Sequence, residues 1–245
     1  MSGELYDILG ARYVANRRTD PRIAELLWAQ LGDAASVLNV GAGTGSYEPP
    51  HRQVTAVEPS DAMRARRPPG SPECVAGVAE ALPFPDDAFD VSMTVFSDWF
   101  WEDQRAGFAE MRRVARERVV VLSFDRSAAE DFWLSREYLP HAHDLWGSFD
   151  TTLEHLGECE VIAVPIPGDC VDGFFHAFWQ RPHAYLDGSI TEAMAVFRRL
   201  EEREAKDGLR RLSEDLQSGA WQARHAYLNG RESIDVGYRL LVSTV

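Results

Sequence analysis

The feature that most constrains the fold is a short apolar run that ends in a glycine-rich turn. Residues 37–40 read Val-Leu-Asn-Val, and Gly41-Ala42-Gly43-Thr44-Gly45 follow at once. An apolar run of this length is typical of a buried parallel strand, and glycines at its end let the backbone turn tightly and approach a ligand. Open α/β sheets bind ligands at the carboxyl ends of their strands. The pattern therefore predicts an α/β protein with a ligand site at this turn.

Expected strands and helices alternate through the first half of the chain. After the first strand we expect strands over residues 54–58, 74–78, 89–95 and 118–124, and helices from Ser60 and over 102–116. Two helices are expected earlier, within residues 3–31. Parallel strands need crossover connections, which helices normally supply. The alternation predicts a Rossmann-like, doubly wound, mostly parallel sheet.

The alternation loosens after Asp125. Residues 126–147 and 168–230 are rich in aromatic side chains at irregular spacing. The elements expected in this half are a helix over 148–157, a strand over 159–166, a helix over 191–216 and a final strand over 234–245. We expect a single domain over residues 1–245, with residues 1–31 as a helical lid and the two aromatic segments as cap insertions.

Composition excludes several classes of partner. The formal net charge of −14 opposes the phosphate attraction on which non-specific nucleic-acid binding depends, so no nucleic-acid partner is expected. No run reaches the roughly 20 apolar residues of a membrane helix, and the N-terminus lacks a secretory signal pattern. We expect a cytoplasmic protein. The three cysteines, Cys74, Cys159 and Cys170, share no metal-ligand spacing, so no metal is expected.

Glu58 ends the second expected strand, seventeen residues after Gly41. A carboxylate there can accept hydrogen bonds from both ribose hydroxyls of an adenosine. Dinucleotide folds also pair glycines with an acid, but their G-x-G-x-x-G fingerprint opens a helix that holds a pyrophosphate. Here G-x-G-x-G is followed by Ser-Tyr-Glu-Pro-Pro, a poor start for such a helix. The spacing favours S-adenosyl-L-methionine (SAM), which has no phosphate, over NAD(P).

In these segments the sequence resembles the class I SAM-dependent methyltransferases of the bacterial small-molecule type. The resemblance runs from about Tyr13 to Asp125 and is carried by VLNVGAGTG, VTAVEPS, AEALPFPDDAFD and MRRVARERVVVLSFD. It implies SAM as cofactor and a small-molecule methyl acceptor. The cofactor-binding residues that it implies are Tyr13, Arg17, Gly41, Ala42, Gly43, Gly45, Glu58, Ala79, Glu80, Thr94 and Val95.

The resemblance also implies a role for each group. The glycine turn would line the methionine and ribose, and Glu58 would hold the ribose hydroxyls. Ala79 and Glu80 would flank the adenine, while Thr94 and Val95 would approach the sulfonium. In the lid, the Tyr13 ring would cover SAM and Arg17 would pair its carboxylate; packing of Tyr13 and solvation of Arg17 is the alternative.

Three positions depart from the family pattern. Asn39 stands where the family usually has Asp, and Val78 where an Asp often contacts the adenine amine. Trp99-Phe100-Trp101 replaces a His-His-Trp run, so a catalytic histidine is absent there. Because the sulfonium is already an activated leaving group, positioning can suffice and no catalytic residue is assigned.

Candidates for the acceptor site lie in the insertions. His141 or His143 could act as a general base, with a structural role as the alternative. Asp169 and Asp172 could hold an acceptor amine or simply form turns. Several aromatic side chains could form the floor of an apolar pocket or could pack in the core. They are Trp133, Phe174, Phe175, Phe178 and Trp179. Two other functions remain open: an NAD(P)-dependent oxidoreductase and a SAM-binding protein without transfer activity.

Overall fold

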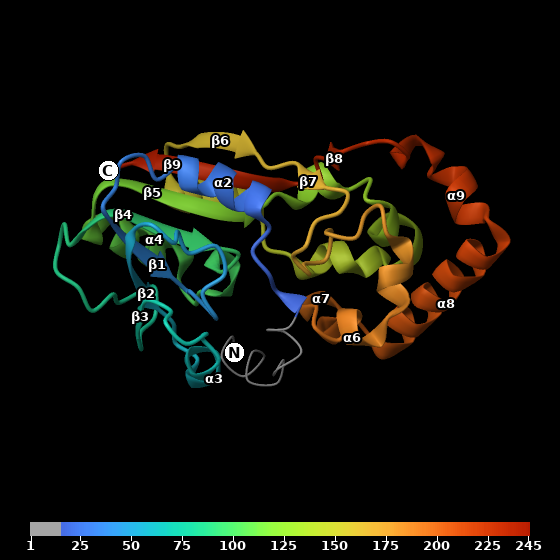
Figure 1. The fold of residues 1–245 in the computed structure, drawn as a ribbon, viewed down its shortest axis with the longest axis horizontal. Coiled ribbons are helices and arrows are strands. Elements are labelled where there is room, and N and C mark those ends of the chain that lie inside the picture. The colour runs from blue at the N-terminus through green and yellow to red at the C-terminus, as the bar shows by residue number, and fades with distance from the viewer. Residues whose placement is uncertain (1–15) are drawn as a thin grey trace.

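The computed structural model describes residues 16–245, which form a seven-stranded sheet extended at one end by a helical cap (Figure 1). The strand order is β3-β2-β1-β4-β5-β9-β6. The strands are β1 (Ser36–Val40), β2 (Gln53–Val57), β3 (Glu73–Val75), β4 (Phe89–Val95), β5 (Ala115–Phe124), β6 (Glu160–Ala163) and β9 (Tyr238–Thr244). Strands β1 to β5 pair in parallel, while β9 is antiparallel to both β5 and β6. The predicted Rossmann-like, mostly parallel sheet is confirmed.

Helices cover both faces of this sheet. Helix α2 (Pro21–Ala29) packs on one face, and α4 (Gln104–Val114) and α5 (Phe149–Leu156) pack on the other, while the short helix α3 (Asp61–Ala65) lies beyond the end of β2. Strand β5 separates two hydrophobic clusters, because successive side chains of a strand point to opposite faces. Val120 and Leu122 pack in the cluster that contains α2, whereas Val119 and Val121 pack with α4 and α5. A strand buried on both faces explains why β5 is apolar without alternation.

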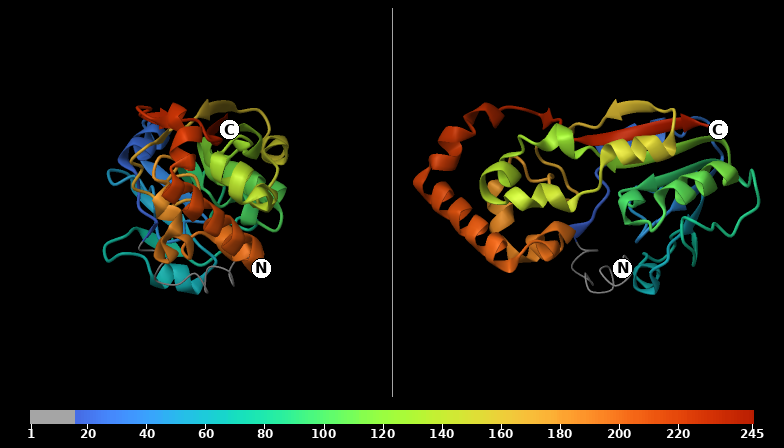
Figure 2. Two further views of the ribbon diagram at one scale, coloured as in Figure 1. Left: turned by 90° about the vertical axis from the view of Figure 1, so that its right-hand side faces the viewer. Right: turned by 180° about the vertical axis from the view of Figure 1, so that it is seen from behind.

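The cap is built from one long helix, α8 (Glu202–Ser218), and several short helical segments. The short segments are η2 (Arg126–Ala129), η3 (Leu134–Tyr138), η4 (Pro140–Leu145), η5 (Pro182–Leu186), α6 (Gly188–Thr191), α7 (Ala195–Arg199), α9 (Ala220–Arg224) and η6 (Ala226–Leu228). Helices α8 and α9 form the outer edge, far from the sheet (Figure 2). The cluster on the α2 face continues into the cap through Trp133, Trp179 and Trp221.

Three predicted elements of the second half need correction. The helix expected over 191–216 is divided into α6, α7 and α8, because Met194, Leu200 and Glu201 have extended backbones. The strand expected over 159–166 reaches only Ala163 in the main sheet. Residues 166–167 form β7 (Ile166–Pro167), which pairs with β8 (Ser233–Ile234) in a separate ribbon.

The final strand also begins later than expected. Gly237, between β8 and β9, has a φ of 91°, and a Cβ there would lie 2.2 Å from the carbonyl oxygen of Asp125. Only glycine fits this close approach. The turn brings Tyr238 into register with Phe124 at the carboxyl end of β5, which is the edge of the sheet where the site lies.

Candidate functional site

A cavity of about 440 Å³ opens where β1, β2 and β4 end. This volume lies in the usual range of small-molecule and cofactor sites. The predicted site residues that line it are Arg17, Gly41, Ala42, Gly43, Glu58, Ala79, Glu80 and Val95. Gly45 and Thr94 do not line it, and Tyr13 lies outside the described residues. We call this space the first cavity.

The glycine turn is held rigidly against β2. The amides of Gly41 and Ala42 both donate to the carbonyl oxygen of Val57, at 2.9 and 3.0 Å. Gly41 has a φ of 67°, and a Cβ there would lie 2.3 Å from Oγ of Ser97. A side chain at Gly41 would therefore both strain the backbone and displace the loop after β4.

Glu58 lies beneath this turn, with 6% of its surface exposed. Its carboxylate accepts hydrogen bonds from the amides of Gly43, at 2.8 Å, and Ser60, at 2.9 Å. Burial raises the pKa of Glu58, and the two amide bonds oppose that shift. Each oxygen keeps a further lone pair, so the carboxylate can also accept hydroxyl donors from the first cavity.

Asn39 presents an unsatisfied acceptor at the end of β1. Its Nδ2 donates to Oε1 of Glu48 at 3.1 Å, while its Oδ1 is buried and has no hydrogen-bond partner in residues 16–245. Glu48 is also paired with Arg67 at 2.8 Å, and both side chains are buried. Asn39 lines the first cavity. A buried acceptor without a partner is costly, and an ammonium group of a ligand would satisfy it.

Glu80 and Thr94 have structural hydrogen bonds. Oε1 of Glu80 accepts from the amides of Glu102, at 2.7 Å, and Asp103, at 3.2 Å, and so fixes the loop that begins α4. Thr94 is fully buried and donates to the carbonyl oxygen of Val40 at 2.9 Å. Thr94 therefore holds β4 to β1 instead of facing a ligand.

A second cavity of about 60 Å³ adjoins the first and shares Arg17, Phe96 and Phe100 with it. Its other lining residues are Trp99, Trp146, Gly173, Phe174, Phe175, Met194, Ala195, Val196 and Tyr238. Both cap insertions contribute to it, as expected. The sheet also contributes, because Tyr238 belongs to β9, and Phe96 and Trp99 follow β4.

Phe96 lines both cavities, and no pattern in the sequence predicted it. Its φ of 55° is unusual for a bulky residue and indicates local strain, which often occurs at functional sites. The amide of Phe96 donates to the carbonyl oxygen of Leu122 at 2.8 Å. Its ring lies 5.8 Å from that of Phe174 and 5.4 Å from that of Tyr238, measured between centroids.

Arg17 is tied to the cap. Its Nε donates to Asp172 at 2.8 Å, and Asp172 also accepts from the hydroxyl of Tyr47 at 2.9 Å. Asp172 is fully buried, so it balances the arginine charge instead of facing an acceptor amine. Asp169 is 82% exposed and pairs with Arg22 at 2.6 Å. Neither aspartate lines a cavity.

Several other candidates belong to the core or the surface. His141 is 72% exposed and pairs with Glu204 at 2.9 Å, and neither His141 nor His143 lines a cavity. The interpretation of Trp133 and Trp179 as pocket residues is wrong. Both side chains are buried. The indole N–H of Trp133 donates to the carbonyl oxygen of Trp179 at 2.9 Å, and the indole N–H of Trp179 donates to the carbonyl oxygen of Ile166 at 3.0 Å.

Asp98 is a second residue that the sequence did not reveal. It begins the segment η1 (Asp98–Phe100) and is completely buried. Its carboxylate accepts from Ser123 at 3.1 Å and from Thr152 and Gln104 at 3.2 Å. Burial raises the pKa of Asp98 to about 6, against the lowering effect of these bonds. Asp98 thus anchors the aromatic run that lines both cavities.

Two other kinds of feature are absent from residues 16–245. No group of three or more His, Cys, Asp or Glu side chains is placed to hold a metal ion. No helix in the same range combines the length and apolar character needed to cross a membrane.

Comparisons with known proteins agree with this geometry. Residues 38–122 match a family model described as a methyltransferase domain. A solved structure from Anabaena variabilis, named as a candidate methyltransferase from an antibiotic biosynthesis pathway, is 28% identical with a TM-score of 0.87. The match covers 94% of this chain and 99% of that one. No curated protein sequence matches the chain.

Two more distant structures share the fold alone. A SAM-dependent methyltransferase from Thermotoga maritima, named as a candidate histamine N-methyltransferase, is 21% identical with a TM-score of 0.50, covering 63% of this chain and 78% of that one. The (4+2)-cyclase SpnF is 16% identical with a TM-score of 0.52, covering 91% of this chain and 79% of that one.

Proposed function

We propose, from the premise that this chain belongs to the class I SAM-dependent methyltransferases, that it transfers the SAM methyl group to a small-molecule acceptor. SAM is its cofactor, and it supplies a methyl group on a positively charged sulfur. The protein's task is to hold the donor and the acceptor in line and to exclude water. Positioning of this kind can supply about 7–11 kcal/mol of a reaction barrier.

The observation that most supports a SAM site is the pairing of Glu58 with the unsatisfied Oδ1 of Asn39 in one cavity. We assign the ribose hydroxyls to Glu58 and the methionine ammonium to Asn39. The amide oxygen is neutral, but the carboxylate of Glu48 lies behind it. The adenine would lie toward Ala79 and Glu80, and the sulfonium toward Val95, where the two cavities meet.

The second cavity is the proposed acceptor site. It adjoins the expected position of the sulfonium, and its walls are mostly aromatic, as in sites for apolar molecules. The Anabaena protein is named for an antibiotic biosynthesis pathway, and the net charge of −14 disfavours a nucleic acid. The continuous core between sheet and cap supports a single domain. Of the predicted lid, residues 1–31, α2 packs on the sheet as part of the core, so we propose as a lid over SAM only the residues that precede α2, among which Arg17 lines the first cavity.

The test combines cofactor binding with product mass. Calorimetry should detect binding of SAM and of its demethylated product, and no binding of NAD. Incubation with labelled SAM and a metabolite mixture should then yield a product that is heavier by one methylene. Binding of NAD without SAM would contradict the cofactor, and SAM binding with a product of unchanged mass would contradict methyl transfer.

A further inference from the structure

A buried hydrogen-bonded pair lies at the wall of the second cavity. Tyr238 lines this cavity, and its Oη lies 3.0 Å from Nδ1 of His176. His176 is 1% exposed, and its Nε2 has no hydrogen-bond partner in residues 16–245. The proposed SAM site uses neither side chain.

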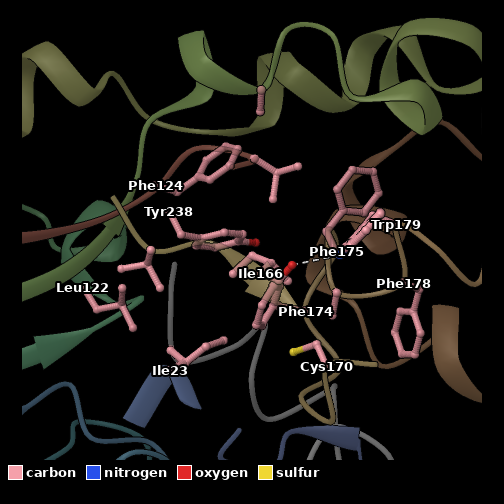
Figure 3. Packing of buried hydrophobic residues seen from close by; sticks show 14 of the residues in the cluster. Ile23, Leu122, Phe124, Ile166, Cys170, Phe174, Phe175, Phe178, Trp179 and Tyr238 are labelled. Atoms are coloured by element: carbon pink, nitrogen blue, oxygen red, sulfur yellow. Dashed lines mark hydrogen bonds between the residues drawn. The ribbon is translucent and has the colours of Figure 1, made fainter. Parts of the chain in front are cut away.

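The surroundings of this pair are apolar. The Tyr238 ring lies between those of Phe124 and Phe174, at centroid distances of 5.2 and 4.6 Å (Figure 3). The His176 ring stacks on Phe124 at 4.8 Å. Burial lowers the pKa of His176 well below its usual value and raises the pKa of Tyr238 well above its own. The resting pair is therefore a neutral imidazole beside a protonated phenol.

A neutral pair of this kind can move one proton. Tyr238 can donate its hydroxyl proton to Nδ1 of His176 while its oxygen accepts a proton from a ligand in the cavity. A buried neutral imidazole is a weak base, so the ligand must release its proton readily. A phenol has a pKa of about 10 and therefore releases its hydroxyl proton far more easily than an alkyl alcohol does.

The other polar groups of the cavity favour a hydroxyl over an amine. Trp99 lines the cavity, and its buried indole N–H has no partner in the described part of the chain, so it can donate to a ligand oxygen. Arg17 also lines the cavity, and no carboxylate does so within residues 16–245. The charge of Arg17 is balanced by Asp172, so a cationic amine would find no free acid there, whereas a neutral hydroxyl has a donor in Trp99 and an acceptor in Tyr238.

We propose that the second cavity takes the hydroxyl-bearing edge of a phenolic acceptor, and that Tyr238, backed by His176, removes the phenolic proton. This inference rests on the proposed methyl transfer. The cavity is smaller than the roughly 150 Å³ that hold benzene in an engineered core. It therefore accommodates one edge of a ring.

The atoms and charges of this step balance. The phenolic O–H bond breaks and its proton passes to Oη of Tyr238, whose own proton passes to Nδ1 of His176. The phenolic oxygen bonds to the methyl carbon, and the electron pair of the broken S–C bond stays on sulfur. Positive charge moves from sulfur to imidazole, so the buried site gains no net charge.

Binding provides the first test, without turnover. Calorimetry would compare phenol with toluene, which has a methyl group in place of the hydroxyl, on protein saturated with S-adenosylhomocysteine. We expect the protein to bind phenol roughly five- to tenfold more tightly, the effect of one or two hydrogen bonds. Tyr238→Phe should lower this preference, because only the indole N–H of Trp99 is then left to bond the phenol oxygen. Tyr185→Phe is the matched control, because Tyr185 is equally buried, donates to the carbonyl oxygen of Phe175 and lines neither cavity.

Rates over a phenol series provide the second test. Tyr238→Phe should slow methylation of phenol by at least about 100-fold, the usual lower range for general-base catalysis. The loss should shrink for 4-nitrophenol, which ionises without help. His176→Gln should show the same pattern, and it tests the pair if the Tyr238 variant does not fold.

Each outcome has a definite meaning. If the protein binds SAM but prefers toluene to phenol, or methylates only amines, the phenol proposal is wrong and methyl transfer stands. If Tyr238→Phe behaves as Tyr185→Phe does, the pair plays no part in proton removal. If the unaltered protein does not bind SAM, the proposed function itself fails.

Discussion

The SAM side of the molecule, by which we mean the walls of the first cavity where we propose that SAM binds, and the cap hold their residues in place by different means. On the SAM side, backbone amides and short side chains at strand ends fix each group, as the two amides that bind Glu58 illustrate. In the cap, aromatic rings from distant segments pack against one another, as Trp133 does with Tyr185 and Trp221. Backbone geometry requires particular residues at fixed spacing, which can be recognised in the sequence as a motif. Packing of rings from distant segments changes only the aromatic content of those segments. Changes in the two regions should therefore have different effects.

The largest effect is expected in the cap. Trp179→Ala should lower the free energy of unfolding by about 3–5 kcal/mol, because it removes a fully buried indole and leaves a void. Thermal melts beside SAM titrations measure this, and any loss of SAM binding should follow the unfolded fraction. Tyr227→Ala is the control, since that cap side chain is 56% exposed. A Trp179 variant with an unchanged melting temperature and impaired turnover would contradict the packing role that we assign to this cap residue.

The next effect concerns Asp98, at the junction of the two regions. Its folded pKa of about 6 exceeds the ordinary value of 3.8, so the folded state retains a proton that the unfolded state has lost. Stability should therefore fall as the pH rises from about 4 to about 6, by up to about 3 kcal/mol. Asp98→Asn should remove this fall, as urea melts at several pH values would record. The exposed Asp144→Asn should keep it; equal pH dependence in all three proteins would contradict the assignment.

The smallest effect is expected on the SAM side. Glu58→Ala should weaken SAM binding by about 1.5–3 kcal/mol, the range for hydrogen bonds to a charged group. Folding should survive, because the amide of Gly43 lines the first cavity and can be solvated, and the side chain of Ser60 still caps α3 by accepting from the amide of Met63. Glu58→Gln keeps an acceptor oxygen and should lose less. Calorimetry decides, and an Ala variant with unchanged SAM affinity would show that another group binds the ribose.

The sequence predicted the first five strands to within a few residues, because each is a short apolar run ended by a turn. It predicted Gly41 and Glu58 at the cavity for the same reason, since strand ends meet at one edge of a sheet. It did not predict Asp98, Phe96 or the pair of His176 with Tyr238. These residues acquire their environments from partners far along the chain, which no local pattern records.

The order in which the chain is synthesised gives β9 a further importance. This strand is the last of the sheet to leave the ribosome, yet it pairs with both β5 and β6 in the interior of the sheet. Until it arrives, β5 presents an open apolar edge, which is a hazard for aggregation. Tyr238, its first residue, is also the last in chain order of the residues that line the second cavity. A nascent chain can thus assemble the glycine turn and Glu58 early, while the second cavity is completed only when β9 has been synthesised.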